Sequence, residues 1–118
     1  MNNLSNTELK KLESVFTKIQ RNIENGLNTL FVTPPIRVAK VWKRDQGGGG
    51  KSISITGDTI EKAAVNFSSI SGNKLPESSI AEELKSKSNK FHAMGVSVIA
   101  HPMNPFCLTS HMNVRIFL

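Results

Sequence analysis

Residues 36–70 read IRVAKVWKRDQGGGGKSISITGDTIEKAAVNFSSI and contain three segments with the character of β-strands. From Ile36 onward the side chains fall into two sets with a period of two, which is typical of a strand whose successive side chains point to opposite faces. The dipeptide Gly57-Asp58 separates the second segment from the third and predicts a turn. This part of the chain therefore predicts a meander of antiparallel strands.

Four consecutive glycines, Gly47 to Gly50, stand before Lys51 and Ser52 and invite comparison with a phosphate-binding P-loop. That motif needs a glycine where this sequence has Asp45, and it needs a helix after the Lys-Ser pair, whereas residues 52–55 alternate as a strand. We therefore set the P-loop aside. Two interpretations stay open: a backbone segment that lies close to a ligand, where a Cβ would clash, and the tip of a long hairpin.

The residues before the meander predict an amphipathic helix over about 6–30. Ser5 and Glu8 have the spacing of a capping box, and Pro34-Pro35 end the helical pattern. Steps of three and four place the apolar residues on one stripe, which consists of Leu9, Leu12, Phe16, Ile19, Ile23, Leu27 and Leu30. We expect a structural helix that lies on the sheet.

The second half of the chain predicts two further strands. Residues 71–90 are rich in Ser, Asn and Lys and predict a surface excursion, while residues 91–101 and 109–118 predict strands joined by a loop. The whole chain, 1–118, is then one α+β domain, an antiparallel sheet flanked by helices. Because the chain ends with its last strand, we expect either a strand at a sheet edge or a fragment of a longer fold.

Composition narrows the class of protein. The 118 residues carry a formal net charge of +6, which favours anionic partners. No apolar run is long enough for a membrane span, and the first residues lack the basic start and apolar stretch of a secretory signal. The single cysteine, Cys107, excludes an internal disulfide and a multi-thiolate metal site, so we expect a cytoplasmic protein.

The last two predicted strands contain the residues best suited to bind a ligand or transfer a proton. In the final strand one set of alternate residues is apolar and the other is mostly polar. If the two strands pair as a hairpin, one surface collects Ser97, His101, His111, Asn113 and Arg115. The alternative is a solvated sheet face, but such a face favours Lys, Glu and Thr over two His, Asn and Arg, so we favour a ligand site.

Each of these side chains has a definite capability. Arg115 can bind a carboxylate through two parallel N–H groups, Asn113 and Ser97 can donate or accept further hydrogen bonds, and either histidine can transfer a proton near neutral pH. His101 and His111 alone make an incomplete metal site, so a metal ion would need ligands from elsewhere.

Several motifs of this sequence resemble the oxygen-dependent coproporphyrinogen III oxidase family. They occur in order as Trp42-Lys43-Arg44 with the glycine run and Lys51-Ser52, Glu61 to Ser68, Phe91 to Ser97, His101 to Pro105, and Thr109 to Arg115. The resemblance covers most of residues 30–118. It implies the N-terminal portion of a homodimeric enzyme with a large antiparallel sheet sandwiched by helices.

The resemblance also implies a reaction and roles for particular residues. The family converts two propionates of coproporphyrinogen III to vinyl groups, giving protoporphyrinogen IX in haem synthesis, with O2 as co-substrate and no organic cofactor. By motif, Ser97 and the segment Asn113-Val114-Arg115 correspond to substrate-binding positions. His111 corresponds to the proton donor, and His101 and His111 to ligands of a possible divalent metal. Four basic residues near the glycine run, Lys40, Lys43, Arg44 and Lys51, can add steering or contacts to the anionic substrate.

The sequence departs from the family pattern in three respects. Ala64 stands where the family usually has glycine, Leu108 stands where it usually has proline, and the chain is much shorter than family members. An alternative function is therefore a truncated porphyrin-binding fragment without turnover. A nucleic-acid module ranks far behind, because one Trp and no Tyr provide few stacking platforms.

Overall fold

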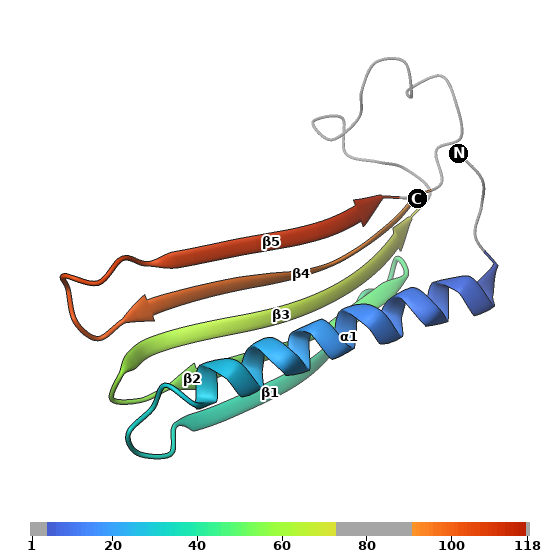
Figure 1. Ribbon diagram of the computed structural model, residues 1–118. Coiled ribbons are helices and arrows are strands. Elements are labelled where there is room, and N and C mark those ends of the chain that lie inside the picture. Colours follow the sequence, from blue (N-terminus) through green and yellow to red (C-terminus); the bar gives the residue numbers. More distant parts are fainter. Residues whose placement is uncertain (1–4, 73–90, 118) are drawn as a thin grey trace.

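The computed structural model describes residues 5–72 and 91–117. In chain order the elements are α1 (Asn6–Asn28), β1 (Ile36–Lys43), β2 (Gly48–Thr56), β3 (Ile60–Gly72), β4 (Phe91–Pro102) and β5 (Ser110–Phe117). The strands form one sheet in the order β1-β2-β3-β4-β5, and every neighbouring pair is antiparallel (Figure 1). The α+β class and the antiparallel meander are thereby confirmed.

Helix α1 begins as its sequence predicts. Ser5 has an extended backbone, and its Oγ accepts a hydrogen bond from the Glu8 N–H at 3.2 Å, which satisfies one free donor of the first turn. The helix ends at Asn28, where the Thr29 N–H bonds back to the Gly26 carbonyl, slightly before the predicted end near residue 30. Among the described residues, no helix is long and apolar enough to cross a membrane.

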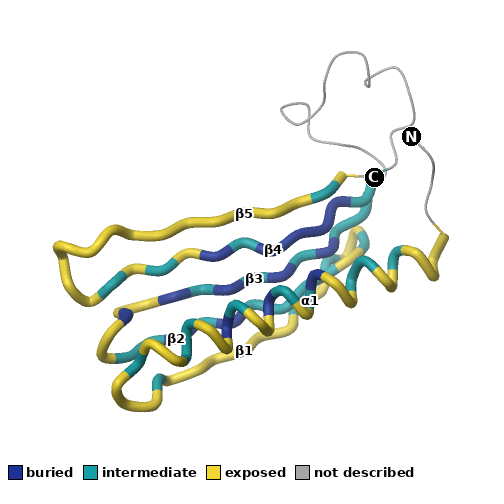
Figure 2. The backbone as a smooth tube through the Cα atoms, in the orientation of Figure 1, coloured by how far each residue is buried: buried dark blue, intermediate teal, exposed yellow. Residues whose placement is uncertain are grey.

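The core lies between α1 and the central strands. Phe16 of the helix packs into a buried cluster formed with Val65, Phe67, Met94, Val96 and Val98. A second cluster, Ile53, Ile55, Ile60 and Ala63, lies under the C-terminal half of the helix, where Leu27 packs against it. Figure 2 shows the result, since β3 and β4 contain most of the buried positions and β1 and β5 are largely exposed.

The register assigns each strand residue to one of two faces. Residues that pack beneath α1 define the helix face. The alternate residues point away from α1 and define what we call the far face, which includes Lys40 and Trp42 on β1, Gly50 and Ser52 on β2, Asn66 and Ser68 on β3, Gly95, Ser97, Ile99 and His101 on β4, and His111, Asn113 and Arg115 on β5.

The glycine run is not a loop but mostly strand. Gly48, Gly49 and Gly50 belong to β2, and only Gly47 lies in the turn, where φ is +116°. A Cβ added at Gly50 would lie 2.6 Å from the Trp42 ring and would clash with the Phe67 carbonyl oxygen. Gly50 is thus closely approached by Trp42 and Phe67 of this chain, the interpretation of a segment close to a ligand stays a prediction, and the hairpin tip is confined to the turn that Gly47 closes.

The predicted surface excursion over 71–90 lies outside the described residues, apart from its first two positions. Ser71 and Gly72 belong to the end of β3, where Ser71 pairs with His92 and Gly72 with Phe91.

Candidate functional site

A row of polar side chains crosses the far face at the centre of the sheet. Asn66 on β3 is paired with Ser97 on β4, and Ser97 is paired with Asn113 on β5. Directly opposed side chains of antiparallel strands lie about 5 Å apart at Cβ, so the hydroxyl is flanked by a carboxamide on each side. These three groups offer both donors and acceptors to one bound molecule.

The adjacent row brings Arg115 beside a strand that carries no side chain at that point. Arg115 is paired with Gly95, and a Cβ added at Gly95 would lie 3.0 Å from the Arg115 Cα and 3.2 Å from its Cβ. Gly95 is paired with Ser68, Ser68 with Gly50 and Gly50 with Trp42. The guanidinium and the indole therefore stand on the two outer strands, with glycine and serine between them.

The far face is thus a floor of small residues with longer side chains along two edges. Over most of this floor the inner strands present glycine, serine, alanine and asparagine, namely Gly50, Ser52, Ser54, Ala64, Asn66, Ser68, Gly95 and Ser97. Towards the end that carries the histidines, β4 presents the larger Ile99 and His101. β1 presents Lys40 and Trp42, and β5 presents His111, Asn113 and Arg115. At a strand spacing of about 4.8 Å, the two outer strands are roughly 19 Å apart. Such a surface suits a broad, flat, anionic molecule.

The two histidines lie at one end of this face. His111 is paired with Ile99, and both histidines are exposed. His101 follows on β4, where its Nδ1 lies 3.4 Å from the Thr109 Oγ1. By register His101 and His111 are diagonal neighbours, which places their Cα atoms about 7–8 Å apart.

Comparison with known proteins gives the family. The family model described as coproporphyrinogen III oxidase matches residues 11–118. The chain belongs to the coproporphyrinogen III oxidase family. It is similar to an oxygen-dependent coproporphyrinogen-III oxidase of Prochlorococcus marinus subsp. pastoris, with 38% identity over 109 residues. That match covers 92% of this chain and 32% of the relative, so the chain spans about a third of the length of the curated relative. The resemblance found in the sequence is confirmed.

The structure brings most of the predicted site residues together, with one exception. Ser97, Asn113 and Arg115 are close neighbours on the far face, with His111 and His101 at its end. Val114 pairs with Val96, so its side chain points to the helix face, where it is 43% exposed. On the far face, Val114 therefore presents no side chain.

The structure also adds residues that the sequence reasoning missed. Asn66 and Ser68 join the site through the register of β3 with β4, and Trp42 joins it through the register of β1 with β2. Alternation along residues 60–70 was visible in the sequence, but it does not say which residue faces Ser97. The basic residues near the glycine run do not share one face of the sheet. Lys40 lies on the far face, whereas Lys43 and Lys51 lie on the helix face.

A metal ion does not fit the described residues alone. Within residues 5–72 and 91–117, no group of three or more His, Cys, Asp or Glu side chains converges. His101 and His111 are two imidazoles, and a stable divalent site needs at least one further ligand. Cys107 is exposed in the connection between β4 and β5 and joins neither histidine.

Proposed function

We propose that the protein carrying this chain converts two propionates of coproporphyrinogen III to vinyl groups, giving protoporphyrinogen IX, and that the far face forms part of its substrate site. The proposal rests on the family and on the name of the relative, which is oxygen-dependent. The structural observation that carries it is the register, which sets Ser97, Asn113 and Arg115 side by side above a floor of small residues.

The groups on the far face support this proposal. Coproporphyrinogen III is a broad macrocycle with four propionates, and Arg115 can bind one carboxylate through two parallel N–H groups. Ser97, Asn66 and Asn113 can hydrogen-bond the same propionate or its neighbour. Because the inner strands carry small side chains in the rows between Trp42 and Arg115 and between Lys40 and Asn113, the macrocycle can approach this part of the sheet closely.

The overall reaction needs a proton as well as an oxidant. For each propionate, one C–C bond breaks to release CO2 and one hydrogen leaves the adjacent carbon, so that a vinyl group forms. Two electrons pass to O2, which leaves as hydrogen peroxide. When the propionate is ionised, this balance consumes one proton. We assign its donation to His111, at the edge of the floor beside Asn113, because an imidazole can transfer protons near neutral pH.

Substrate binding is assigned to Ser97, Asn113, Arg115 and the backbone of Val114. His101 and His111 are proposed ligands of a divalent metal whose remaining ligands lie outside the described residues, and no step of the reaction is drawn through that metal. We further infer that the full-length protein is a cytoplasmic homodimer with O2 as co-substrate and no organic cofactor. Light scattering of the full-length protein tests the dimer directly.

Two substitutions in the full-length protein test the assignment. Arg115→Ala and His111→Ala should each reduce aerobic turnover of coproporphyrinogen III at least tenfold. The first removes the guanidinium that binds a propionate, and the second removes the imidazole that donates the proton. Arg21→Ala is the matched control, since it removes the same charge from an exposed position on α1, on the other side of the sheet.

Two further readouts are measured beside turnover. Circular dichroism shows whether each variant is folded, and porphyrin fluorescence titration separates binding from turnover. Wild-type turnover in both folded variants would overturn the site. Tight porphyrin binding by the wild-type protein with no turnover under air would instead support the alternative function of a porphyrin-binding protein.

A further inference from the structure

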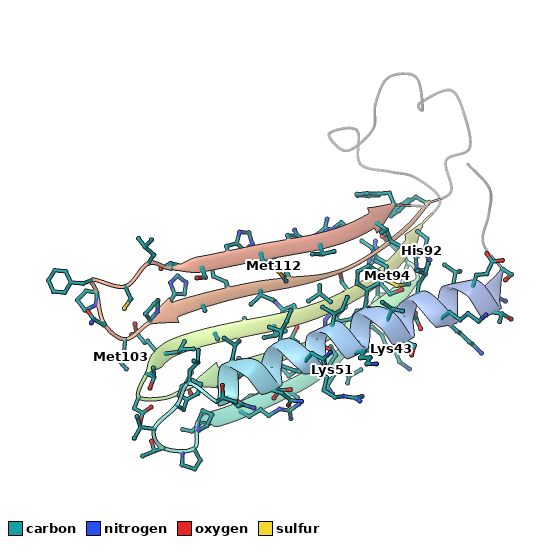
Figure 3. The ribbon with its side chains drawn as sticks, viewed as in Figure 1. Lys43, Lys51, His92, Met94, Met103 and Met112 are labelled. Carbon is teal, nitrogen blue, oxygen red and sulfur yellow. The ribbon has the colours of Figure 1, made fainter. Side chains whose placement is uncertain are left out.

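A pocket lies on the helix face, between the N-terminal half of α1 and the sheet. Its volume is about 650 Å³. Glu13 and Thr17 line it from α1, and Lys43, Lys51, Ser69 and His92 line it from the sheet. Figure 3 labels Lys43, Lys51 and His92, which come from β1, β2 and β4. The polar side chains named here lie on the helix face, and the lining also includes Trp42 and Gly50, which the register assigns to the far face.

The floor of this pocket is open because one position of β2 has no side chain. Gly49 is paired with Lys43 on one side and with Ser69 on the other. A Cβ added at Gly49 would lie 3.3 Å from the Lys43 Cα and would clash with the Trp42 carbonyl oxygen. Glycine therefore leaves bare backbone between a lysine and a serine.

A hydroxyl and an imidazole provide a directed hydrogen bond. Ser69 is only 5% exposed, and its Oγ lies 2.9 Å from the His92 Nε2. If Nε2 accepts from the hydroxyl, the proton of the neutral ring is on Nδ1. If Nε2 donates, the hydroxyl keeps its own proton free. In either tautomer, the pair retains one donor for a further partner.

The charge of the pocket is positive. Lys51 is paired with Val41, so Lys43 is its diagonal neighbour on β1, within reach of a long side chain. Glu13 is the one carboxylate among the lining residues, against two lysines. Within the described part of the chain the ion pair that forms is Arg37 with Glu24, so neither lysine is neutralised there.

We propose that this pocket binds a small phosphate-type oxyanion, held by the ammonium groups of Lys43 and Lys51 and by a hydrogen bond from the Ser69–His92 pair. A phosphate monoester carries about −1.5 to −2 charges at pH 7, which matches two lysines. Lysine is a common phosphate ligand that acts as a point charge. The inference is independent of the proposed function, because the polar side chains of the two sites lie on opposite faces of the sheet.

Calorimetric titration of the full-length protein with inorganic phosphate, at fixed ionic strength, tests the proposal. Lys43→Met and Lys51→Met should each weaken binding about tenfold or more, because each removes a charged hydrogen-bond partner. Ser69→Ala should weaken binding by a smaller factor. Lys18→Met is the matched control, since this exposed lysine of α1 does not line the pocket, and its phosphate affinity should equal that of the wild type.

The outcomes are distinct. Saturable phosphate binding that falls in the two pocket variants and not in the control supports the site. Absence of saturable binding, or an equal loss in Lys18→Met, overturns it, because the effect would then reflect the net charge alone. Succinate carries a similar charge on carboxylates. If it binds as tightly as phosphate and is lost in the same variants, the phosphate class is overturned in favour of a dicarboxylate. Circular dichroism of every variant confirms that binding is compared between folded proteins.

Discussion

Gln20 is a buried amide on α1, and its replacement by glutamate tests how the helix is held on the sheet. Only 3% of the residue is exposed, and its Nε2 donates to the carbonyl oxygens of Lys51, at 2.8 Å, and of Val65, at 2.9 Å. The substitution Gln20→Glu keeps the shape of the side chain but removes the donor. An oxygen atom then faces two carbonyl oxygens.

The expected loss of stability depends on pH. An ionised carboxylate at this position would be buried without a donor, and an uncompensated buried charge costs about 3–5 kcal/mol. A protonated carboxyl can donate to one of the two carbonyls, so that about 1 kcal/mol is lost with the other hydrogen bond. Burial raises the pKa of the new carboxyl above its unfolded value of about 4.3. The loss of stability of Gln20→Glu relative to the wild type is therefore largest above the raised pKa and becomes smaller as the pH falls towards 4.

Urea denaturation followed by circular dichroism at pH 7 and at pH 5 measures this difference. The matched control is Gln46→Glu in the exposed turn after β1, where Oε1 accepts from the Arg44 Nη2 at 2.9 Å and a carboxylate can do the same. The control should change the free energy of unfolding by less than about 0.5 kcal/mol. If Gln20→Glu costs less than about 1 kcal/mol at pH 7, or costs the same at both pH values, the reasoning that this amide donates to both carbonyls is refuted.

Two further predictions concern the turn before β3 and the glycines of β4 and α1. The Asp58 carboxylate accepts from the Thr33 hydroxyl at 2.8 Å and from its N–H at 3.0 Å, and these hydrogen bonds, the hydroxyl first, hold the pKa of Asp58 below its ordinary value. The stability that this lowered pKa contributes is present above the unfolded pKa of about 3.9 and is lost as the pH falls through the folded pKa. The melting temperature of Asp58→Asn should therefore fall less steeply below pH 4 than that of the wild type. Gly95→Ala should destabilise the protein by about 1–3 kcal/mol, because the new Cβ would clash with the Val114 carbonyl oxygen and would lie 3.0 Å from the Arg115 Cα. Gly26→Ala, where a Cβ would meet nothing within 4 Å, should instead stabilise it by about 0.5–1 kcal/mol. A melting temperature of Gly95→Ala at or above that of the wild type would contradict the first expectation, and one of Gly26→Ala below that of the wild type would contradict the second.

Much of the fold follows from local pattern. The capping spacing of Ser5 and Glu8 and the stripe through Phe16 predicted α1, and the period-two alternation predicted all five strands to within a few residues. The glycine run was the main surprise, because glycine has low strand propensity and reads as a loop. Gly48 to Gly50 form a strand nonetheless, because they take part in the pairing of β2 with its neighbours β1 and β3. The backbone of the neighbouring strands, and the Trp42 ring at Gly50, leave no room for a Cβ, which explains why these residues are glycine.

Local pattern also predicted part of the candidate site. Alternation placed His111, Asn113 and Arg115 on one face of the last strand, and the hairpin with β4 added Ser97. Val114 entered the prediction through its motif, although its parity puts the side chain on the helix face. Asn66 could not be found, because its nearness to Ser97 is a matter of register between strands, not of spacing along one strand.

The sequence by itself determined the family, the class of each element and the parity of every strand, because these depend on motifs and on the periods of backbone geometry. Only the tertiary structure decided which residues meet across strands. It placed Lys43 and Lys51 with His92 beneath α1, and it placed Lys40 and Trp42 across the far face from Arg115. The physical reason is that register is set by the joint packing of Phe16, Val65, Phe67 and Met94 in one core, since a slip of one residue would turn every one of these strand side chains to the wrong face.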